Sequence, residues 1–217
     1  SMDNDDIHYK TNRENAIIIA SDVQTASANV FAGCMGTATV QSGFDILLTR
    51  IGNKYVVEPA TQKGKELALS LSDAQEATPV DLGRREQVWE DNSKFLRKHE
   101  LKVKLDDLPS LLERSYDHPV WEEKAKHCFS CGSCNMVCPT CYCFDVQDEV
   151  DWSLKHGKRY RTWDSCMLKE FAMVAGGHNF RKKEEERYRH RYYRKGKYIP
   201  DKIGQIACVG CGRYITA

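Results

Sequence analysis

Four cysteines at fixed spacing constrain this chain more than any other feature. With the proline that follows them they form the pattern C-x2-C-x2-C-x3-C-P, at Cys128, Cys131, Cys134, Cys138 and Pro139. Two residues between successive cysteines let one loop present three thiolates to a 4Fe–4S cube, whereas the cysteine before the proline points away and, in two-cluster proteins, binds the other cube. The run therefore predicts three ligands of one cube and one ligand of another.

A second, shorter motif lies near the end of the sequence, at Cys208-Val-Gly-Cys211-Gly-Arg-Tyr214. In a two-cluster arrangement its third cysteine would stand at position 214, where this chain has tyrosine, and its fourth at position 218, after the last residue given. One cube would use Cys128, Cys131, Cys134 and position 218. The other would use Cys138, Cys208, Cys211 and position 214. Each predicted cube is one protein ligand short.

Three further cysteines could supply the missing ligands: Cys141, Cys143 and Cys166. An open iron could instead bind solvent, or these thiols could be buried and inert. The sequence leaves these alternatives open. Cys34 has no neighbouring cysteine and is expected to be a core or loop thiol.

The cysteine count favours metal binding over disulfides. Nine of the ten cysteines lie between residues 128 and 211, and the first residues are polar and acidic rather than a secretion signal. Disulfide frameworks belong to oxidising compartments, so we expect a cytoplasmic chain with thiolate ligands. A structural zinc site is the alternative, although zinc prefers two C-x2-C pairs a dozen or more residues apart. No apolar run approaches the roughly 18 residues that span a membrane.

The pattern of apolar residues predicts an α+β fold in two parts. Residues 12–78 are expected to form a small α+β domain with a strand at 15–20, a hairpin at 44–58 and a helix at 62–71. Residues 79–217 are expected to form a mostly helical, ferredoxin-like dicluster domain. Residues 1–120 carry 14 Lys and Arg against 19 Asp and Glu, and residues 121–217 carry 18 against 12, which also suggests two regions.

A strongly basic segment separates the two motifs. Residues 181–197 hold nine basic and three acidic residues, interleaved with tyrosines. This composition is compatible with nucleic-acid binding or with a solvated helix. We favour a third interpretation, in which the positive charge stabilises the reduced form of an anionic cluster or docks an acidic protein partner.

The residues around the motifs resemble a known family over 121–213. The resemblance is carried by Cys-Pro-Thr-Cys-Tyr-Cys-Phe-Asp145, Arg161-Thr-Trp-Asp-Ser-Cys166, Phe171-Ala-x-Val-Ala-Gly-Gly-His-Asn-Phe-Arg181 and Cys-Val-Gly-Cys-Gly-Arg213. The chain is similar to the iron–sulfur β subunits of hydrogenases and sulfur reductases, a family that includes an iron–sulfur component of anaerobic sulfite reductase. Members of that family are longer at both ends, so we expect a fragment.

The resemblance implies a non-catalytic relay with one or two 4Fe–4S clusters. Such a relay passes single electrons between a flavin or ferredoxin partner and a catalytic reductase or hydrogenase subunit. The sequence shows no catalytic constellation and no flavin or nucleotide motif. Two other functions remain open at this point: a zinc-stabilised interaction module and an iron–sulfur redox sensor.

Overall fold

The computed structural model describes residues 6–217. The helices are α1 Ile7–Asn15, α2 Gln62–Leu69, α3 Pro79–Phe95, α4 Leu108–Arg114, α5 Val120–Ala125, α6 Ser133–Met136, α7 Glu184–Tyr193 and α8 Pro200–Ile203. The strands are β1 Ile19–Ser21, β2 Ile46–Ile51, β3 Lys54–Pro59, β4 Phe144–Val150 and β5 Gly157–Trp163. A π-helical turn at Arg194–Tyr198 continues α7 towards α8.

A three-stranded sheet with strand order β1-β2-β3 organises the first part of the chain. β1 runs parallel to β2, and β2 pairs antiparallel with β3 in a register that sets Ile51 opposite Lys54. This register leaves a two-residue turn, in which Gly52 has a φ of 73°. Such a conformation is costly for residues with a Cβ, which explains the glycine at the tip.

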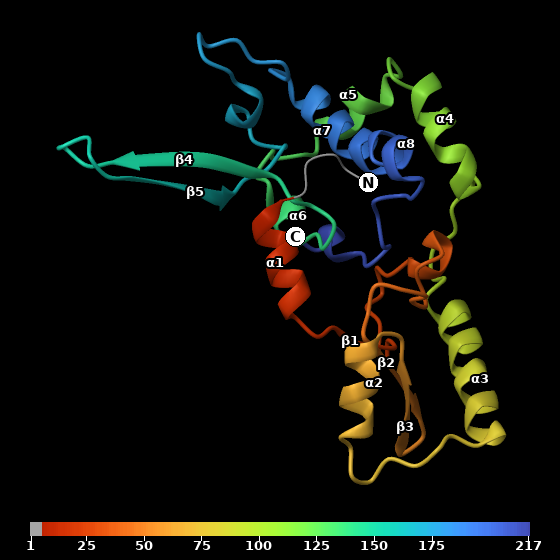
Figure 1. Ribbon diagram of the computed structural model, residues 1–217. Helices are drawn as coiled ribbons and strands as arrows, with labels where there is room; N and C mark the ends of the chain where they lie inside the picture. The colour runs from red at the N-terminus through yellow and green to blue at the C-terminus, as the bar shows by residue number, and fades with distance from the viewer. Residues whose placement is uncertain (1–5) are drawn as a thin grey trace.

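Helices α2 and α3 cover opposite faces of this sheet (Figure 1). Ile46 of β2 lies under Gly64 of α2, whereas Thr49 accepts a hydrogen bond of 3.2 Å from the indole N–H of Trp89 in α3. Alternate residues of a strand point to opposite faces, so these two contacts identify the two layers. Close packing of α2 requires the glycine, because a Cβ at residue 64 would lie 1.9 Å from the carbonyl oxygen of Asp45.

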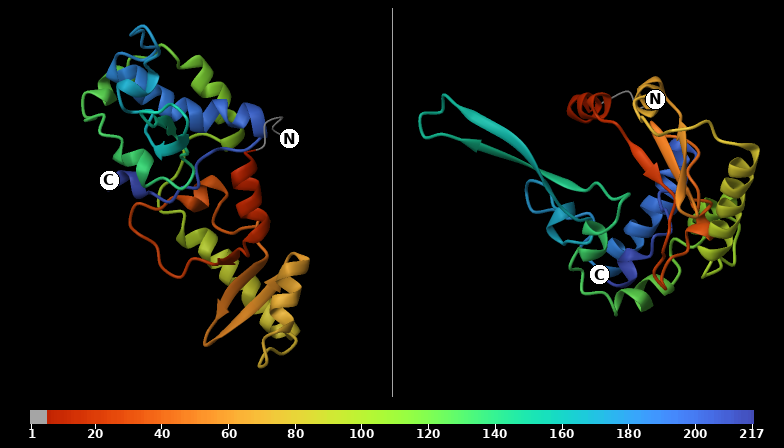
Figure 2. Two further views of the ribbon diagram at one scale, coloured as in Figure 1. Left: turned by 60° about the vertical axis from the view of Figure 1, so that its left-hand side comes forward. Right: turned by 90° about the horizontal axis from the view of Figure 1, so that it is seen from below.

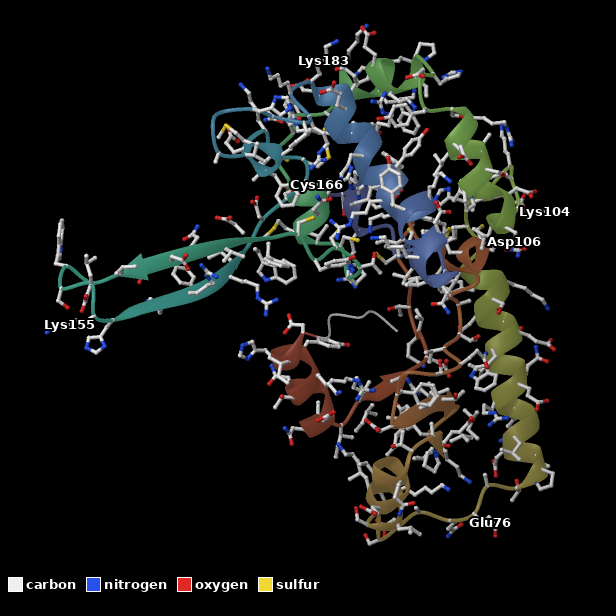
Figure 3. All side chains as sticks on the ribbon, turned by 45° about the horizontal axis from the view of Figure 1, so that its top comes forward. Glu76, Lys104, Asp106, Lys155, Cys166 and Lys183 are labelled. Carbon is white, nitrogen blue, oxygen red and sulfur yellow. The ribbon has the colours of Figure 1, made fainter. Side chains whose placement is uncertain are left out.

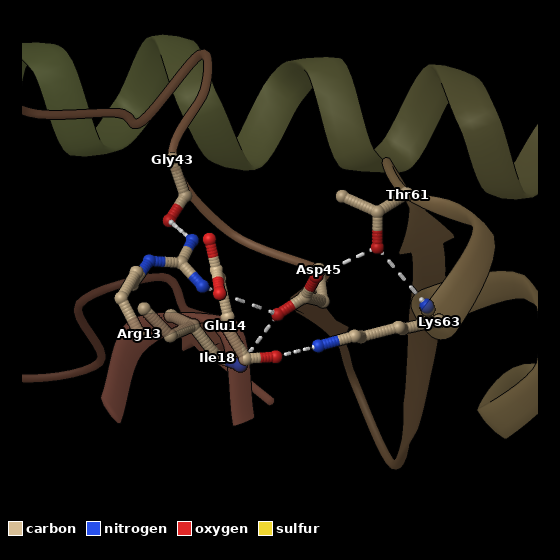
Figure 4. A network of polar contacts seen from close by, with 8 residues as sticks. Arg13, Glu14, Ile18, Gly43, Asp45, Thr61 and Lys63 are labelled. Carbon is tan, nitrogen blue, oxygen red and sulfur yellow. Dashed lines mark hydrogen bonds and ion pairs between the residues drawn. The ribbon is translucent and has the colours of Figure 1, made fainter. Parts of the chain in front are cut away.

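A buried carboxylate joins the chain entering the sheet to α2 (Figure 4). Asp45 is 4% exposed and accepts hydrogen bonds from the backbone N–H of Ile18 at 2.7 Å and the hydroxyl of Thr61 at 2.6 Å. These two bonds, with help from the charge of Arg13, hold the pKa of Asp45 below its usual value. Thr61 also caps α2 through the N–H of Gly64.

The second part of the chain gathers helices around α7, and a two-stranded hairpin projects away from them (Figures 1 and 2). Tyr193 of α7 is 1% exposed, stacks edge-on against Trp121 of α5, and donates a hydrogen bond to the carbonyl of Leu112 in α4. The hairpin consists of β4 and β5 in antiparallel register from Phe144–Trp163 to Val150–Gly157. Most of its side chains are exposed.

The structure agrees with some predicted elements and corrects others. The hairpin at 44–58 and the helix at 62–71 are present as β2–β3 and α2. The predicted buried strand at 15–20 is wrong: α1 occupies its first residue, and only Ile19–Ser21 pairs, with Ile19 52% exposed. The β4–β5 hairpin was not predicted. The division into 12–78 and 79–217 remains a prediction, although α3 packs on the first sheet.

Within residues 6–217, no helix combines the length and the apolar character needed to cross a membrane.

The fit between α2 and the sheet can be tested with two glycines. Replacing Gly64 with alanine is expected to lower the free energy of unfolding by about 1–3 kcal/mol, because the new Cβ meets a backbone carbonyl that cannot move aside. Gly83→Ala in α3 is the matched control. It meets no atom within 4 Å and is expected to raise the stability by about 0.5–1 kcal/mol. Chemical unfolding under anaerobic conditions measures both, and equal effects would contradict the packing argument.

Candidate metal centre

The first cysteine loop lies between α5 and α6. Its backbone turns sharply: Ser130 has a φ of 52° and Gly132 a φ of 80°. A Cβ at Gly132 would lie 2.9 Å from the Cβ of Ser165, so only glycine fits there. The N–H of Ser130 points at the sulfur of Cys128 at 3.4 Å. Backbone N–H groups directed at sulfur are among the features that set the potential of iron–sulfur sites.

The thiols of this loop differ in their surroundings. The hydroxyl and N–H of Ser133 lower the pKa of the exposed Cys131. Burial raises the pKa of Cys134, and the nearby guanidinium of Arg191 partly opposes that effect. Electrostatic interactions link Cys134 to both Cys128 and Cys131. That these three thiols hold one cube remains a prediction.

Cys138 and Cys141 lie together in the next turn. The N–H of Cys141 donates a hydrogen bond of 3.2 Å to the carbonyl of Cys138. A hydrogen bond from the Cys141 thiol, assisted by Thr140 and Lys195, lowers the pKa of Cys138 to about 3. The same thiol–thiol bond and burial raise the pKa of Cys141.

The second motif is held by a loop of the first part of the chain. The N–H of Phe31 donates to the carbonyl of Gly210 at 2.8 Å, and the hydroxyl of Thr37 donates to the carbonyl of Val209 at 2.8 Å. A Cβ at Gly212, where φ is 71°, would lie 2.2 Å from the carbonyl oxygen of Asn29. This close backbone approach fixes the position of Cys208 and Cys211 and requires the glycine that separates Cys211 from Arg213.

Cys143 and Cys166 form a buried pair, 4% and 2% exposed. Figure 3 labels Cys166. The guanidinium of Arg194 donates to the sulfur of Cys143 at 3.1 Å, and the amide of Asn135 donates to the sulfur of Cys166 at 3.1 Å. A hydrogen bond from Cys166 lowers the pKa of Cys143 to about 6, and burial works against this shift. The same bond, together with burial, raises the pKa of Cys166.

One face of α7 and its continuation carries four cations, Arg187, Arg191, Arg194 and Lys195, of which Arg194 and Lys195 contact sulfur directly. Successive members of this set are four, three and one residues apart, which places all four along one side of a helix. Arg187 and Arg191 are only 4% and 5% exposed. Among residues 6–217 none of the four forms an ion pair with a carboxylate. We refer to these four residues as the cationic face.

Each member of the cationic face contacts a different part of the cysteine region. The guanidinium of Arg187 donates to the carbonyl of Met167 at 3.0 Å and to the hydroxyl of Ser130 at 3.3 Å. The Nε of Arg191 donates to the Oδ1 of Asn135 at 3.0 Å. The ammonium of Lys195 lies 3.1 Å from the sulfur of Cys138.

The donor set fits 4Fe–4S clusters. Soft thiolates are the ligands that hold iron–sulfur clusters, and these thiols receive hydrogen bonds from N–H groups and face unpaired cations. No group of three or more His, Cys, Asp or Glu side chains in residues 6–217 is set closely enough to hold a single metal ion. The thiol of Cys34 donates to the carbonyl of His99.

The structure also identifies residues that the cysteine motifs did not indicate, namely Asn135, Thr140 and the individual members of the cationic face. Asn135 is 3% exposed and bonds Ser165, Cys166 and Arg191. The recurrence of basic residues at 187, 191 and 195 was a signal in the sequence, because that spacing marks one helical face.

Comparison with known proteins defines the class. Residues 127–217 match the 4Fe-4S dicluster domain family, and the protein accordingly binds 4Fe–4S clusters. The chain is also similar to the sulfhydrogenase 2 subunit beta of Pyrococcus furiosus, with 33% identity over 210 residues. That alignment covers 96% of this chain and 60% of the relative. No solved structure gave a significant match. These findings confirm the resemblance to iron–sulfur β subunits of hydrogenase and sulfur reductase type.

Lys195 is expected to tune the potential of the cluster for which Cys138 is a predicted ligand. Replacing it with methionine removes a positive charge beside the sulfur, which disfavours the more negative, reduced state. We expect the midpoint potential to fall by on the order of 60 mV, a tenfold change in a one-electron equilibrium. Lys197→Met is the control, since Lys197 already pairs with Glu113 and Asp201. Redox titration followed by electron paramagnetic resonance (EPR) measures both, and equal shifts would refute the local effect.

Proposed function

We propose that this chain is an electron-transfer subunit that relays single electrons between a flavin or ferredoxin partner and a catalytic hydrogenase or reductase subunit. The observation that carries the proposal is the dicluster domain, with its thiols arranged along a cationic face that has no carboxylate partners in the described residues. The relative's name, a β subunit of a sulfhydrogenase, supports a multisubunit redox complex. Reduction of a sulfur compound such as sulfite, in anaerobic cytoplasm, is the finer form of the proposal.

The proposal includes a ligand assignment. Cys128, Cys131 and Cys134 hold one cube, and Cys138 joins Cys208 and Cys211 at the other. Support comes from the C-x2-C-x2-C spacing of the first loop, and from the contacts of Thr140 and Lys195 with the carbonyl of Ala207, which bring Cys138 near Cys208. The fold remains proposed as a small α+β unit followed by a ferredoxin-like dicluster region.

The residues around the thiols prepare the site for one-electron chemistry. A bound 4Fe–4S cube supplies a one-electron couple. The cationic face offsets the negative charge that reduction adds, and its buried guanidiniums act at low dielectric, where a charge has the most effect. Packing of α5 and α7 around the loop keeps these groups in place, so little reorganisation accompanies electron arrival.

Cluster content gives the direct test. Anaerobically purified protein is expected to contain iron and acid-labile sulfide in equal amounts, about eight of each per chain for two cubes, with a broad absorption near ~400 nm that dithionite bleaches. Cys128→Ala is expected to lose about half of the iron. Cys34→Ala is the matched control and is expected to lose none, because the Cys34 thiol is hydrogen-bonded to the carbonyl of His99.

Colourless protein that carries stoichiometric zinc would overturn the proposal in favour of a structural module. Clusters that dithionite cannot reduce would also overturn it, because a relay must change its oxidation state.

A further inference from the structure

We propose that Cys141 supplies the ligand that Tyr214 does not, so that one cube is held by two C-x2-C pairs, Cys138 with Cys141 and Cys208 with Cys211. This inference rests on the proposed function and deepens it by completing a ligand set. Position 214 is where a two-cluster pattern expects a cysteine. Three cysteines outside the two motifs could compensate, and the structure distinguishes among them.

Backbone geometry presents Cys138 and Cys141 as one unit. The N–H of Cys141 bonds the carbonyl of Cys138, which closes a turn over Pro139 and Thr140. The Cys138 sulfur lies 3.4 Å from the hydroxyl of Thr140 within the turn, and the thiol of Cys141 donates to the Oδ1 of Asn135 at 3.7 Å. Neither is fully buried, so both sulfurs can reach a group placed beside the turn.

Two side chains tie this turn to the second motif. The hydroxyl of Thr140, which lies between the two cysteines, donates to the carbonyl of Ala207 at 2.8 Å. The ammonium of Lys195 lies 3.1 Å from the sulfur of Cys138, 2.7 Å from the hydroxyl of Thr140 and 3.1 Å from the carbonyl of Ala207. Ala207 directly precedes Cys208, so the same contacts bring the two pairs of thiols to one place.

The positive charge of the site favours binding of an anionic group. Lys195 contacts a thiol sulfur and two neutral oxygens, and Arg191 interacts electrostatically with Cys138 and Cys141. Neither cation has a carboxylate partner within the described part of the chain. Four thiolates around an oxidised 4Fe–4S core carry a net charge of about −2, which would balance these two cations.

The side chain of Tyr214 makes aromatic and cation–π contacts. Its ring meets the ring of Phe31 edge-on at 6.5 Å, and the guanidinium of Arg191 lies over its face at 4.8 Å. Burial raises the pKa of its phenol, which favours the neutral form over a ligating phenolate. These contacts give Tyr214 a packing role between the second motif and the loop around residue 31.

Cys143 and Cys166 are the weaker candidates. They are only 4% and 2% exposed, with their sulfurs accepting hydrogen bonds from Arg194 and Asn135, whereas Cys141 is only partly buried. Neither makes a contact with the second motif that corresponds to the Thr140–Ala207 bond. Cys141 is therefore the compensating cysteine that the described contacts favour.

Cluster content and EPR of four variants of the whole chain test the assignment. After anaerobic purification, Cys141→Ala is expected to contain about four fewer irons and four fewer sulfides per chain than the unaltered protein, and to lose one reduced-cluster signal. Tyr214→Phe and Cys143→Ala are the matched controls, and both are expected to retain the full content. In the fourth protein, Tyr214→Cys is added to Cys141→Ala, and it is expected to regain the lost iron because it restores a thiol at position 214.

The outcomes separate this inference from the proposed function. If the unaltered protein holds no iron and sulfide, the proposed function fails. If it holds clusters and Cys141→Ala keeps them all, only the role of Cys141 fails. Loss of iron from Tyr214→Phe would assign the ligand to the phenolate, and stoichiometric zinc at the two pairs would assign the site to zinc. Failure of Tyr214→Cys to restore iron in a folded double variant would show that Cys141 acts through packing.

Discussion

Burial of positive charge beside thiols is the constraint on which the rest of this structure depends. Two arginines of α7 are almost fully buried, and no carboxylate of residues 6–217 pairs with any member of the cationic face. Charge in a protein interior is costly unless it is hydrogen-bonded or paired, and these two guanidiniums donate to neutral oxygens such as those of Met167 and Asn135. A nearby anionic group stabilises them further, and thiolates and the clusters they hold are such a group. Thus α7 supplies positive charge to the metal centre, and the negative charge of the metal centre in turn compensates the buried arginines of α7.

The first part of the chain matters to the site because it positions the second cysteine motif. Leu96, fully buried at the end of α3, packs with Val30 and Ala32, and its carbonyl accepts a bond of 3.0 Å from the N–H of Gly33. The loop that contains Val30, Ala32 and Gly33 also packs against the backbone at Gly210 and Gly212. The sheet, α3, this loop and the second motif thus form one continuous path of contacts. A change in how α3 packs on β2 would be transmitted to Cys208 and Cys211 through backbone atoms rather than through flexible side chains.

The sequence correctly predicted the elements that are specified by residues close together in the chain. The turn at Gly52 with alternating residues on either side predicted the β2–β3 hairpin, and the helical spacing after Thr61 predicted α2. The strand at 15–20 failed because its apolar residues do not reach the core: Asn15 ends a helix and Ile19 lies at a sheet edge. The β4–β5 hairpin escaped prediction although Phe144, Val146 and Val150 alternate with polar residues. Its side chains are mostly exposed, so burial does not reinforce the pattern.

The sequence by itself determined the chemistry of this protein, because cysteine spacing dictates which thiols one loop can present to one cluster. It therefore predicted the grouping of Cys128, Cys131 and Cys134 and the basic character of residues 181–197. Only the tertiary structure decided which basic residues face sulfur, since that depends on the rotation of α7 against α5. It also decided that Cys141 lies with Cys138 and near Cys208, whereas Cys143 lies with Cys166. Those pairings arise from contacts between segments up to about 70 residues apart, such as Thr140 with Ala207, and no local pattern encodes them.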